Sequence, residues 1–259
     1  MSTTDSPGLV ETTHGAVRTL TIDRPARRNA LDTPTIEAMI AAVRAAGEDP
    51  SVRTIVITGS GDVAFSAGID LKEEEAPDLT PRELQARRTR LMDLFAAIDG
   101  SSRPVVTRLN GVAMGGGAGL ALVADLVVAA DHAVLCTPEI DVGRWPMAVG
   151  AVLLRAAPLR LATEMMMTGR QVSMTEALDH GLVNRVVPHA DLDRAVAALT
   201  DVLVAKPPAT MALGRTTIRQ MLAMDLPQRL ELAAARLADV IDNDEARAGL
   251  ERFRDRSDG

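Results

Sequence analysis

The chain has 259 residues, of which 47% are hydrophobic and 24% charged, which is ordinary for a globular protein with a large core. Its net charge of -7 argues against a nucleic-acid-binding protein, because such proteins usually carry a basic stripe. The single cysteine, Cys136, excludes an intramolecular disulfide. The start of the chain is polar and no apolar run approaches about 18 residues, so we expect a soluble, cytoplasmic protein with no membrane partner.

The first elements are predicted to be a strand, a helix and a second strand. Residues 16–22 alternate polar and apolar side chains, as a half-buried strand does. Thr33 is the candidate N-cap of a helix whose apolar residues recur at i, i+3, i+4 and i+7. Residues 54–58 form a continuous apolar run that ends at a Gly-Ser-Gly breaker, which predicts a buried strand.

The same order recurs further along the chain. A charged helical stretch at 81–99 precedes a strand at 105–109, and a glycine cluster with a helix precedes a strand at 126–130. This alternation predicts an α/β protein with largely parallel strands. We expect an α/β body over residues 1–191 and a C-terminal helical segment over residues 192–259, packed together as one unit.

Three consecutive glycines, Gly115 to Gly117, lie between a predicted strand and an apolar helix. Each glycine weakens a helix by about 1 kcal/mol, so close approach of the backbone to a ligand is the better explanation for the cluster. The dinucleotide-binding fingerprint fails, because its third glycine would fall on Leu120 or Leu122, and no P-loop lysine follows. We therefore expect a glycine-lined pocket of another kind.

Two further segments are candidates for chemistry. The small residues of 64–70 follow a strand and leave N–H groups that suit negative charge, although a plain strand-to-helix turn is the favoured explanation for this segment taken alone. Glu139 lies in a loop bounded by proline and glycine. A desolvated pocket would raise its pKa from about 4.3 toward a value that suits a general base, whereas Arg144 nearby would lower it. A solvated surface carboxylate is the alternative.

Other reactive residues point to no site. The four histidines are scattered without metal-ligand spacing, so no metal is predicted. Cys136 lies in a predicted strand, where an inert, buried thiol is expected.

Taken in chain order, these segments resemble the enoyl-CoA hydratase/isomerase (crotonase) superfamily over almost the whole chain. The matching features are Asp23-Arg24-Pro25, Asn29-Ala30-Leu31, residues 64–70, Asn110-Gly111 with the triple glycine, Ala124-Asp125, Pro138-Glu139, Gly143, Thr168-Gly169-Arg170, Glu176-Ala177 and residues 181–184. The resemblance implies a crotonase-like spiral of repeated ββα units, a C-terminal segment for assembly, and a homotrimer or dimer of trimers. It also implies an acyl-coenzyme A substrate, with coenzyme A as part of that substrate and no tightly bound cofactor.

The resemblance further implies roles for single residues. The backbone N–H groups of Ile69 and Gly116 would donate to the thioester oxygen, and Glu139 would be the catalytic carboxylate. The stretch Ser66, Ala67 and Gly68 would contact coenzyme A. Arg28, beside Arg27, is a candidate phosphate contact, for which two surface arginines are the equal alternative.

Gly119, a candidate substrate contact, marks the main departure from the family. Hydratases of this family carry there the first of two catalytic glutamates, so the arrangement that holds water is incomplete. One carboxylate beside an oxyanion hole suits a Δ3,Δ2-enoyl-CoA isomerase, which removes a proton from Cα and returns it at Cγ, or the reverse. The alternatives are a hydratase or dehydratase of fatty-acid or related acyl-CoA metabolism, and a non-catalytic acyl-CoA-binding or assembly protein.

Overall fold

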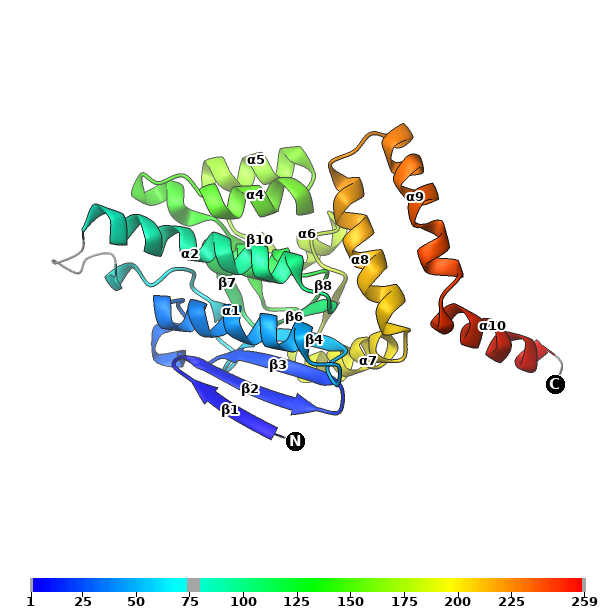
Figure 1. Cartoon of the computed structure of the whole chain (residues 1–259). Coiled ribbons are helices and arrows are strands. Elements are labelled where there is room, and N and C mark those ends of the chain that lie inside the picture. Colours follow the sequence, from blue (N-terminus) through cyan, green and yellow to red (C-terminus); the bar gives the residue numbers. More distant parts are fainter. Residues whose placement is uncertain (1, 74–79, 258–259) are drawn as a thin grey trace.

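The computed structural model describes residues 2–73 and 80–257, and two sheets form its centre (Figure 1). The larger sheet has the strand order β1-β2-β3-β4-β6-β8-β11, and the smaller has the order β10-β9-β7-β5. The strands of the larger sheet are β1 (Ser2–Ser6), β2 (Leu9–His14), β3 (Val17–Ile22), β4 (Thr54–Gly59), β6 (Val105–Leu109), β8 (Leu126–Ala130) and β11 (Arg185–Val187). Those of the smaller sheet are β5 (Ala64–Ser66), β7 (Val112–Met114), β9 (Val134–Cys136) and β10 (Val172–Ser173).

Each turn of the chain contributes one strand to each sheet. The pairs β4–β5, β6–β7 and β8–β9 each place their first strand in the larger sheet and their second in the smaller one. A helix follows each pair: α2 (Pro81–Gly100), α3 (Gly116–Val123) and α4 (Met147–Ala156). The strands from β3 to β11 in the larger sheet pair in parallel, whereas β1 and β2 are antiparallel. The predicted α/β fold of repeated ββα units is confirmed.

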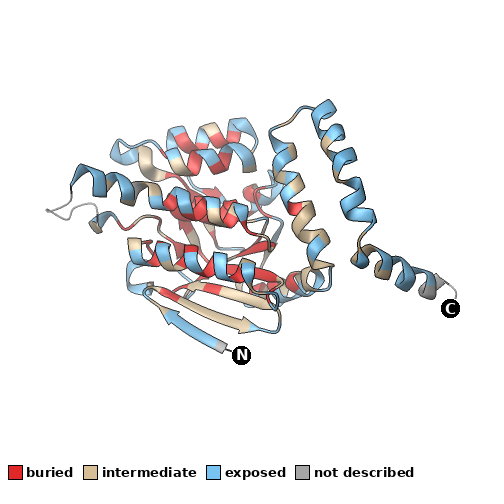
Figure 2. Ribbon diagram, viewed as in Figure 1, coloured by how far each residue is buried: buried red, intermediate tan, exposed pale blue. Residues whose placement is uncertain are grey.

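The remaining helices cover the sheets or extend from them. They are α1 (Thr33–Glu48), α5 (Leu159–Thr168), α6 (Met174–Asp179), α7 (Leu192–Val204), α8 (Pro208–Leu222), α9 (Leu226–Ile241) and α10 (Asp244–Ser257). Short 3-10 turns are η1 (Pro25–Arg27), η2 (Leu71–Glu73), η3 (Pro138–Val142) and η4 (His189–Asp191). In Figure 1, α8, α9 and α10 form an arm beside the body, and α9 has no buried residue (Figure 2).

The central strands of the larger sheet are buried on both faces. All six residues of β4 are buried. Because successive strand residues face opposite ways, Ile55 and Ile57 join the main core beneath α1 and α2, whereas Val56 joins a second cluster. The second cluster contains Leu192 and Val196 of α7. Helix α7 therefore packs on the sheet, while the helices beyond it form the arm, and the predicted division at residues 191 and 192 stays a prediction.

The strands and helices predicted up to residue 130 are confirmed, with one boundary error, whereas several short strands, among them β5, β7, β10 and β11, were not predicted. The N-cap of α1 is Asp32 and not Thr33: the Asp32 carboxylate accepts the Thr35 N–H at 3.0 Å. The Thr33 hydroxyl instead donates to Glu73 at 2.9 Å. Strands β1 and β2 were not predicted, because β1 has no apolar residue and forms only by pairing with β2 at the edge of the sheet.

Among the described residues, no single helix has the length and apolar character of a membrane span. One pair of helical segments bent by 103°, His189–Val204 and Pro208–Leu222, meets those criteria jointly, on length and composition alone.

Arg215 of α8 joins the arm to the body. Its guanidinium donates to the Asp125 carboxylate at 2.6 Å. It also donates to the carbonyls of Ile98 at 2.9 Å and Asp99 at 3.0 Å, and to the carbonyl of Ser101. Because helix α2 ends at Gly100, these carbonyls lie where an α-helix runs out of internal donors, although the Ile98 carbonyl also accepts the Ser101 N–H at 3.2 Å. One buried side chain thus caps α2 and anchors α8.

Arg215→Met is expected to lower the free energy of unfolding by about 2–3 kcal/mol, because it removes the donors of buried carbonyls and the partner of Asp125. Equilibrium urea unfolding measures this change. The matched control is Arg236→Met on α9, whose exposed ion pair with Asp239 should contribute under about 1 kcal/mol. Equal effects of the two substitutions would show that Arg215 does not anchor the arm.

Candidate active site

A cavity of about 750 Å³ opens where five separate segments meet. It is lined by the chain entering α1, the residues after β5, one face of α2, the β7–α3 turn, and the chain from η3 into α4. Its size is within the range of small-molecule sites, and its wall is mostly apolar with a few polar groups. The wall includes both predicted amide donors, Ile69 and Gly116, and the predicted carboxylate, Glu139.

The Ile69 N–H is left free by the way its segment pairs. Leu31 and Ile69 form an isolated parallel bridge. That bridge uses the Gly68 carbonyl, which accepts the Leu31 N–H at 2.7 Å, and the Asp70 N–H, which donates to Leu31 at 2.9 Å. Within the described chain, no acceptor is recorded for the Ile69 N–H itself.

The Gly116 N–H is free because it begins a helix. The first N–H groups of an α-helix have no acceptor within the helix, and Gly116 is the first residue of α3. A Cβ atom placed on Gly116 would lie 3.6 Å from the Ile69 nitrogen, and one on Gly68 would lie 3.0 Å from the Gly116 nitrogen. The two amides are therefore neighbours in the cavity wall, and together they can stabilise a single developing oxyanion.

The glycine cluster lets neighbouring parts of the site pack closely against the start of α3. A Cβ atom on Gly117 would lie 2.2 Å from the Ser66 carbonyl oxygen, so only glycine lets α3 begin against the end of β5. Gly115 has a φ of 53°, and a Cβ atom there would lie 2.9 Å from Glu139 Oε1. The sequence predicted that these glycines let the backbone approach a ligand. They also let the protein's own backbone and the Glu139 carboxylate approach closely, so the prediction was incomplete.

Glu139 presents an unpartnered carboxylate beside the two amides. It lies on η3, and its Oε2 atom is buried without a hydrogen-bond partner among the described residues. Burial raises the pKa of Glu139 above its ordinary value, because the charged form loses hydration. This direction agrees with the expectation that a desolvated pocket raises the pKa of Glu139. A carboxyl group with a raised pKa suits proton transfer near neutral pH.

The other predicted contacts divide between the cavity wall and its support. Ala67 and Gly68 line the cavity. Ser66 does not: its buried hydroxyl donates to the Asn29 carbonyl at 2.8 Å and accepts the Gly68 N–H at 3.2 Å. Arg28 lies outside the wall with an exposed side chain, and its carbonyl accepts the Ala67 N–H at 2.9 Å.

Gly119 is also absent from the cavity wall, because an aromatic ring covers it. A Cβ atom on Gly119 would lie 2.6 Å from Cζ of Phe95, a buried residue of α2. The Phe95 ring therefore occupies the space that a side chain at residue 119 would need. The missing carboxylate has left no vacant polar pocket here.

Sequence reasoning missed the ion pairs that hold the Ile69 turn. Arg24 contacts Asp32 at 2.8 Å and Asp70 at 3.0 Å, and it donates to the Ala30 carbonyl. The sequence analysis used Arg24, Ala30 and Asp70 only as features that match the family, and no local pattern predicts that Arg24 pairs with Asp32 and Asp70. Trp145 also lines the cavity.

Comparisons with known proteins agree with this geometry. Residues 12–258 match the family model described as enoyl-CoA hydratase/isomerase. The carnitinyl-CoA dehydratase of Salmonella arizonae is 40% identical over 219 residues, covering 82% of this chain and 80% of that protein. The mitochondrial enoyl-CoA hydratase domain-containing protein 3 of Xenopus laevis is 30% identical, covering 95% of this chain and 82% of that protein.

The fold has close matches among solved structures. An enoyl-CoA hydratase from Mycobacterium smegmatis superimposes with a TM-score of 0.92 at 33% identity, covering 96% of this chain and 97% of that one. Human enoyl-CoA hydratase domain-containing protein 3 superimposes with a TM-score of 0.91 at 26% identity, covering 96% of this chain and 98% of that one.

Proposed function

The chain belongs to the enoyl-CoA hydratase/isomerase family of acyl-coenzyme A enzymes, and we propose that it transfers a proton at Cα of an enoyl-CoA thioester with Glu139 as the base. Removing that proton forms an enolate, whose negative charge falls on the thioester oxygen. The amides of Ile69 and Gly116 would donate to this oxygen, and one such donor contributes about 2.7–4 kcal/mol. The start of α3 adds the positive end of a helix dipole at the same point.

The favoured reaction is migration of a double bond between the 3-enoyl and 2-enoyl thioesters. The observation that carries this proposal is the Phe95 ring against Gly119, which leaves Glu139 without a second carboxylate at that position. Other acidic side chains in the wall have different roles or settings: Asp70 pairs with Arg24, Glu73 accepts from Thr33, and Asp141 is exposed. A single base can carry a proton between Cα and Cγ without an activated water.

A dehydratase or hydratase is the second candidate, because of the 40% identity to a protein named carnitinyl-CoA dehydratase. In that reaction Glu139 would take the proton from Cα, the bond from Cβ to its hydroxyl would break, and the same proton would leave with the hydroxyl as water. Glu139 alone can move this proton, but with Gly119 under the Phe95 ring no carboxylate at residue 119 would hold the water. The two candidates differ because hydration or dehydration adds or removes a water molecule, whereas migration of the double bond does neither.

Incubation with 3-enoyl-CoA and 2-enoyl-CoA in D₂O distinguishes the candidates. Isomerase activity predicts double-bond migration, with deuterium uptake from solvent where the proton on Glu139 exchanges, and little 3-hydroxyacyl product. Faster formation of the 3-hydroxyacyl thioester would favour the hydratase or dehydratase. Neither turnover nor exchange across several chain lengths would favour a non-catalytic acyl-CoA binder.

Gly119→Glu alone is a poor test of the missing carboxylate, because its side chain would collide with Phe95. The paired variant Gly119→Glu with Phe95→Leu gives the new carboxylate room. We expect this variant to gain hydration activity relative to Phe95→Leu alone, measured as 3-hydroxyacyl-CoA formed from 2-enoyl-CoA. No gain in the folded double variant would show that a second carboxylate at residue 119 is not what limits hydration.

The pH dependence follows from the raised pKa of Glu139. A general base acts only when it is ionised, so kcat/KM should fall as the pH drops through a pKa above the ordinary carboxyl value. We expect one ionisation on the acid side, measured from pH 4 to 9 with a 3-enoyl-CoA substrate. A rate that stays constant down to pH 4 would contradict the assignment of the base.

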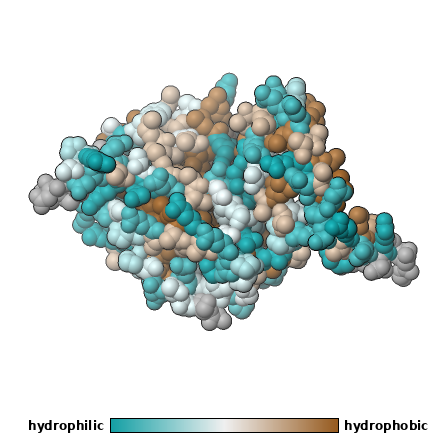
Figure 3. All heavy atoms as spheres, in the orientation of Figure 1, coloured by the Kyte–Doolittle hydropathy of each residue, from teal (hydrophilic) through white to brown (hydrophobic). Residues whose placement is uncertain are grey.

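We also propose that the chain assembles as a homotrimer or a dimer of trimers through the arm. Large apolar side chains are exposed along α8 to α10, among them Ile218, Leu222, Leu226, Leu230, Leu237, Ile241 and Phe253. Helix α9 has no buried residue, and apolar residues gather over this arm in Figure 3. Such an apolar surface favours association. Light scattering should give a mass of three or six chains, and a monomer would contradict the proposal.

A further inference from the structure

Two buried asparagine side chains, Asn29 and Asn110, hold one loop of the protein from two sides. The Asn29 amide donates to the carbonyls of Ser60 at 3.0 Å and Ala64 at 2.8 Å. The Asn110 amide donates to the carbonyls of Gly61 at 2.7 Å and Ala64 at 3.4 Å. We call these two side chains the asparagine clamp. Both of them therefore hold the chain where β5 begins.

The Ala64 carbonyl accepts both amides at a point where β5 is irregular. Strand β5 pairs in parallel with β7, and the register shifts between Ala64 and Ser66, so that Phe65 is an extra residue on β5. A β-bulge of this kind interrupts the ladder and bends the strand, and such bulges often lie next to active sites. The clamp thus supplies hydrogen bonds to a buried part of the sheet where the regular pattern is broken.

Both backbone donors of the active site follow from the clamped segments. Strand β5 continues from Ala64 into the turn that carries the Ile69 amide. Asn110 lies between β6 and β7, and β7 leads directly to Gly116 at the start of α3. The bulge fixes how far β5 has advanced along β7, so it also fixes where Ile69 lies relative to Gly116.

The Asn29 turn supports the Ile69 segment by its backbone as well. Asn29 has a φ of 55°, in the left-handed region that asparagine adopts more readily than most other residues with a side chain. Its carbonyl accepts the Ser66 hydroxyl at 2.8 Å, and Leu31, two residues later, bridges to Ile69. A backbone conformation of this kind persists where the surrounding contacts hold it, and here the clamp provides them.

We propose that Asn29 and Asn110 are positioning residues of the reaction, which act through the β5 bulge to aim the Ile69 and Gly116 amides at one oxygen. Neither asparagine lines the cavity that holds Glu139, so their effect reaches the substrate through the backbone. This inference rests on the proposed function, which supplies the oxyanion. The two asparagines belong to segments that match the family but carry no reactive group.

Asn29→Gly and Asn110→Ala remove the amide donors, and glycine keeps the left-handed backbone at residue 29. A misplacement of about 1 Å can cost about 10²-fold in rate, so kcat with 3-enoyl-CoA should fall about 10- to 100-fold in each variant. The Kd for a thioether analogue of acyl-CoA, which has no carbonyl oxygen, should stay within about twofold. The double variant should lose little more than the weaker single variant, because both side chains act on one bulge.

Isotope-edited infrared spectroscopy measures the oxyanion donors directly. Butanoyl-CoA labelled with carbon-13 at the thioester carbon should show a lower carbonyl stretching frequency when bound than when free, because two donors polarise the C=O bond. Each variant should lose most of this shift, which a loss of stability does not change while the protein stays folded. Circular dichroism defines the folded range, and Asn29→Gly gives both measurements even if Asn110→Ala does not fold.

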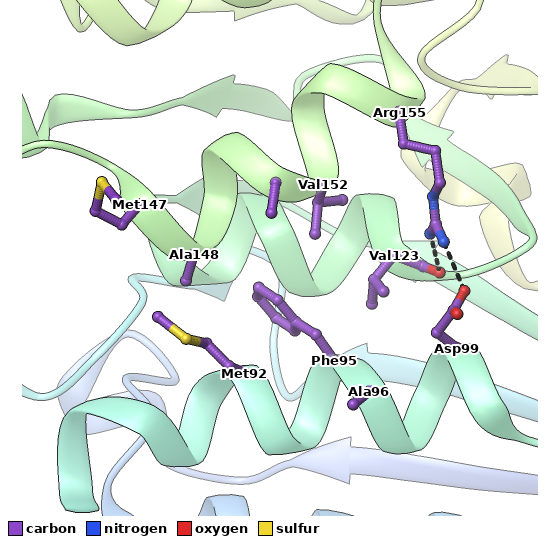
Figure 4. Close-up of a pocket in the computed structure, with 10 residues that line it drawn as sticks. Met92, Phe95, Ala96, Asp99, Val123, Met147, Ala148, Val152 and Arg155 are labelled. Carbon is purple, nitrogen blue, oxygen red and sulfur yellow. Dashed lines mark hydrogen bonds and ion pairs between the residues drawn. The ribbon is translucent and has the colours of Figure 1, made fainter. Parts of the chain in front are cut away.

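Arg155→Met is the matched control, because it also removes a side-chain donor from a backbone carbonyl beside α3. Figure 4 shows Arg155 donating to the Val123 carbonyl, at 3.2 Å, and contacting Asp99, at 2.5 Å. Val123 is the last residue of α3, so this variant loosens the helix at the end away from Gly116. It should leave kcat and the carbonyl shift unchanged.

Unchanged kcat and an unchanged carbonyl shift in the folded asparagine variants would overturn the proposal, as would equal losses in Arg155→Met. A carbonyl shift in the unmodified protein without turnover of any thioester would refute the proposed function alone, since the shift still tests the clamp. An unmodified protein that binds butanoyl-CoA with no carbonyl shift would refute both.

Discussion

Glu139→Gln is expected to lower the rate of Cα deuterium exchange and of turnover by about 10²–10⁴-fold, the usual contribution of a positioned general base. The amide of glutamine has nearly the shape of the carboxyl group but cannot accept the proton. The two backbone donors remain, so the Kd for a thioether analogue should change little. Exchange measured by mass spectrometry and binding measured by calorimetry separate these two effects.

The same substitution should stabilise the fold at neutral pH. Burial raises the pKa of Glu139, so the folded state binds the proton more tightly than the unfolded state. That favourable contribution is complete below the unfolded pKa and is lost as the pH rises through the folded pKa. Once ionised, the carboxylate, with Oε2 unpartnered, therefore opposes folding, and a neutral glutamine does not.

A rise in the melting temperature together with the loss of activity would mark Glu139 as a functional and not a structural residue. Glu48→Gln, at an exposed position at the end of α1, is the control and should change neither quantity. Full exchange activity in Glu139→Gln would mean that another group removes the proton, and the proposed mechanism would be wrong.

Gly117→Ala is expected to reduce kcat by about 10²–10³-fold, the effect of losing one oxyanion donor. The new methyl group would lie 2.2 Å from the Ser66 carbonyl oxygen, and neither backbone can move without opening the site. Separating the start of α3 from the end of β5 moves the Gly116 and Ile69 amides apart. Steady-state kinetics with a 3-enoyl-CoA substrate measures the loss.

Overpacking should also lower the free energy of unfolding of Gly117→Ala by about 1–3 kcal/mol, so activity is compared at a temperature where circular dichroism shows the variant folded. Gly214→Ala is the matched control, since a Cβ atom there meets nothing within 4 Å and the site lies within α8. It should retain full activity and gain up to about 1 kcal/mol of stability. Full activity in folded Gly117→Ala would show that the contact between β5 and α3 does not position the donors.

Burial of the catalytic cavity improves both the base and the two amide donors. Burial in the cavity wall keeps water from the Glu139 carboxylate and so raises its pKa, which improves it as a base at neutral pH. The same exclusion makes the two free amides stronger donors. Substitutions that admit water to this wall should therefore weaken catalysis even where they leave Glu139 untouched.

The sequence by itself determined the parts of the fold that depend on near neighbours. Strand β4 was predicted from five consecutive residues, α1 from apolar residues three and four apart, and the glycine cluster from its own composition. The family resemblance added the expected site residues Ile69, Gly116 and Glu139, which line one cavity. Their catalytic roles remain predictions for the experiments above.

Only the tertiary structure decided how distant segments meet. It placed Phe95 of α2 over Gly119 of α3, Glu139 beside Gly115, and Arg215 against Asp125. It also paired β1, which has no apolar pattern of its own, with β2. The physical reason is that periodicity records the faces of a helix or strand but not the partner of each face, which close packing of the whole chain selects.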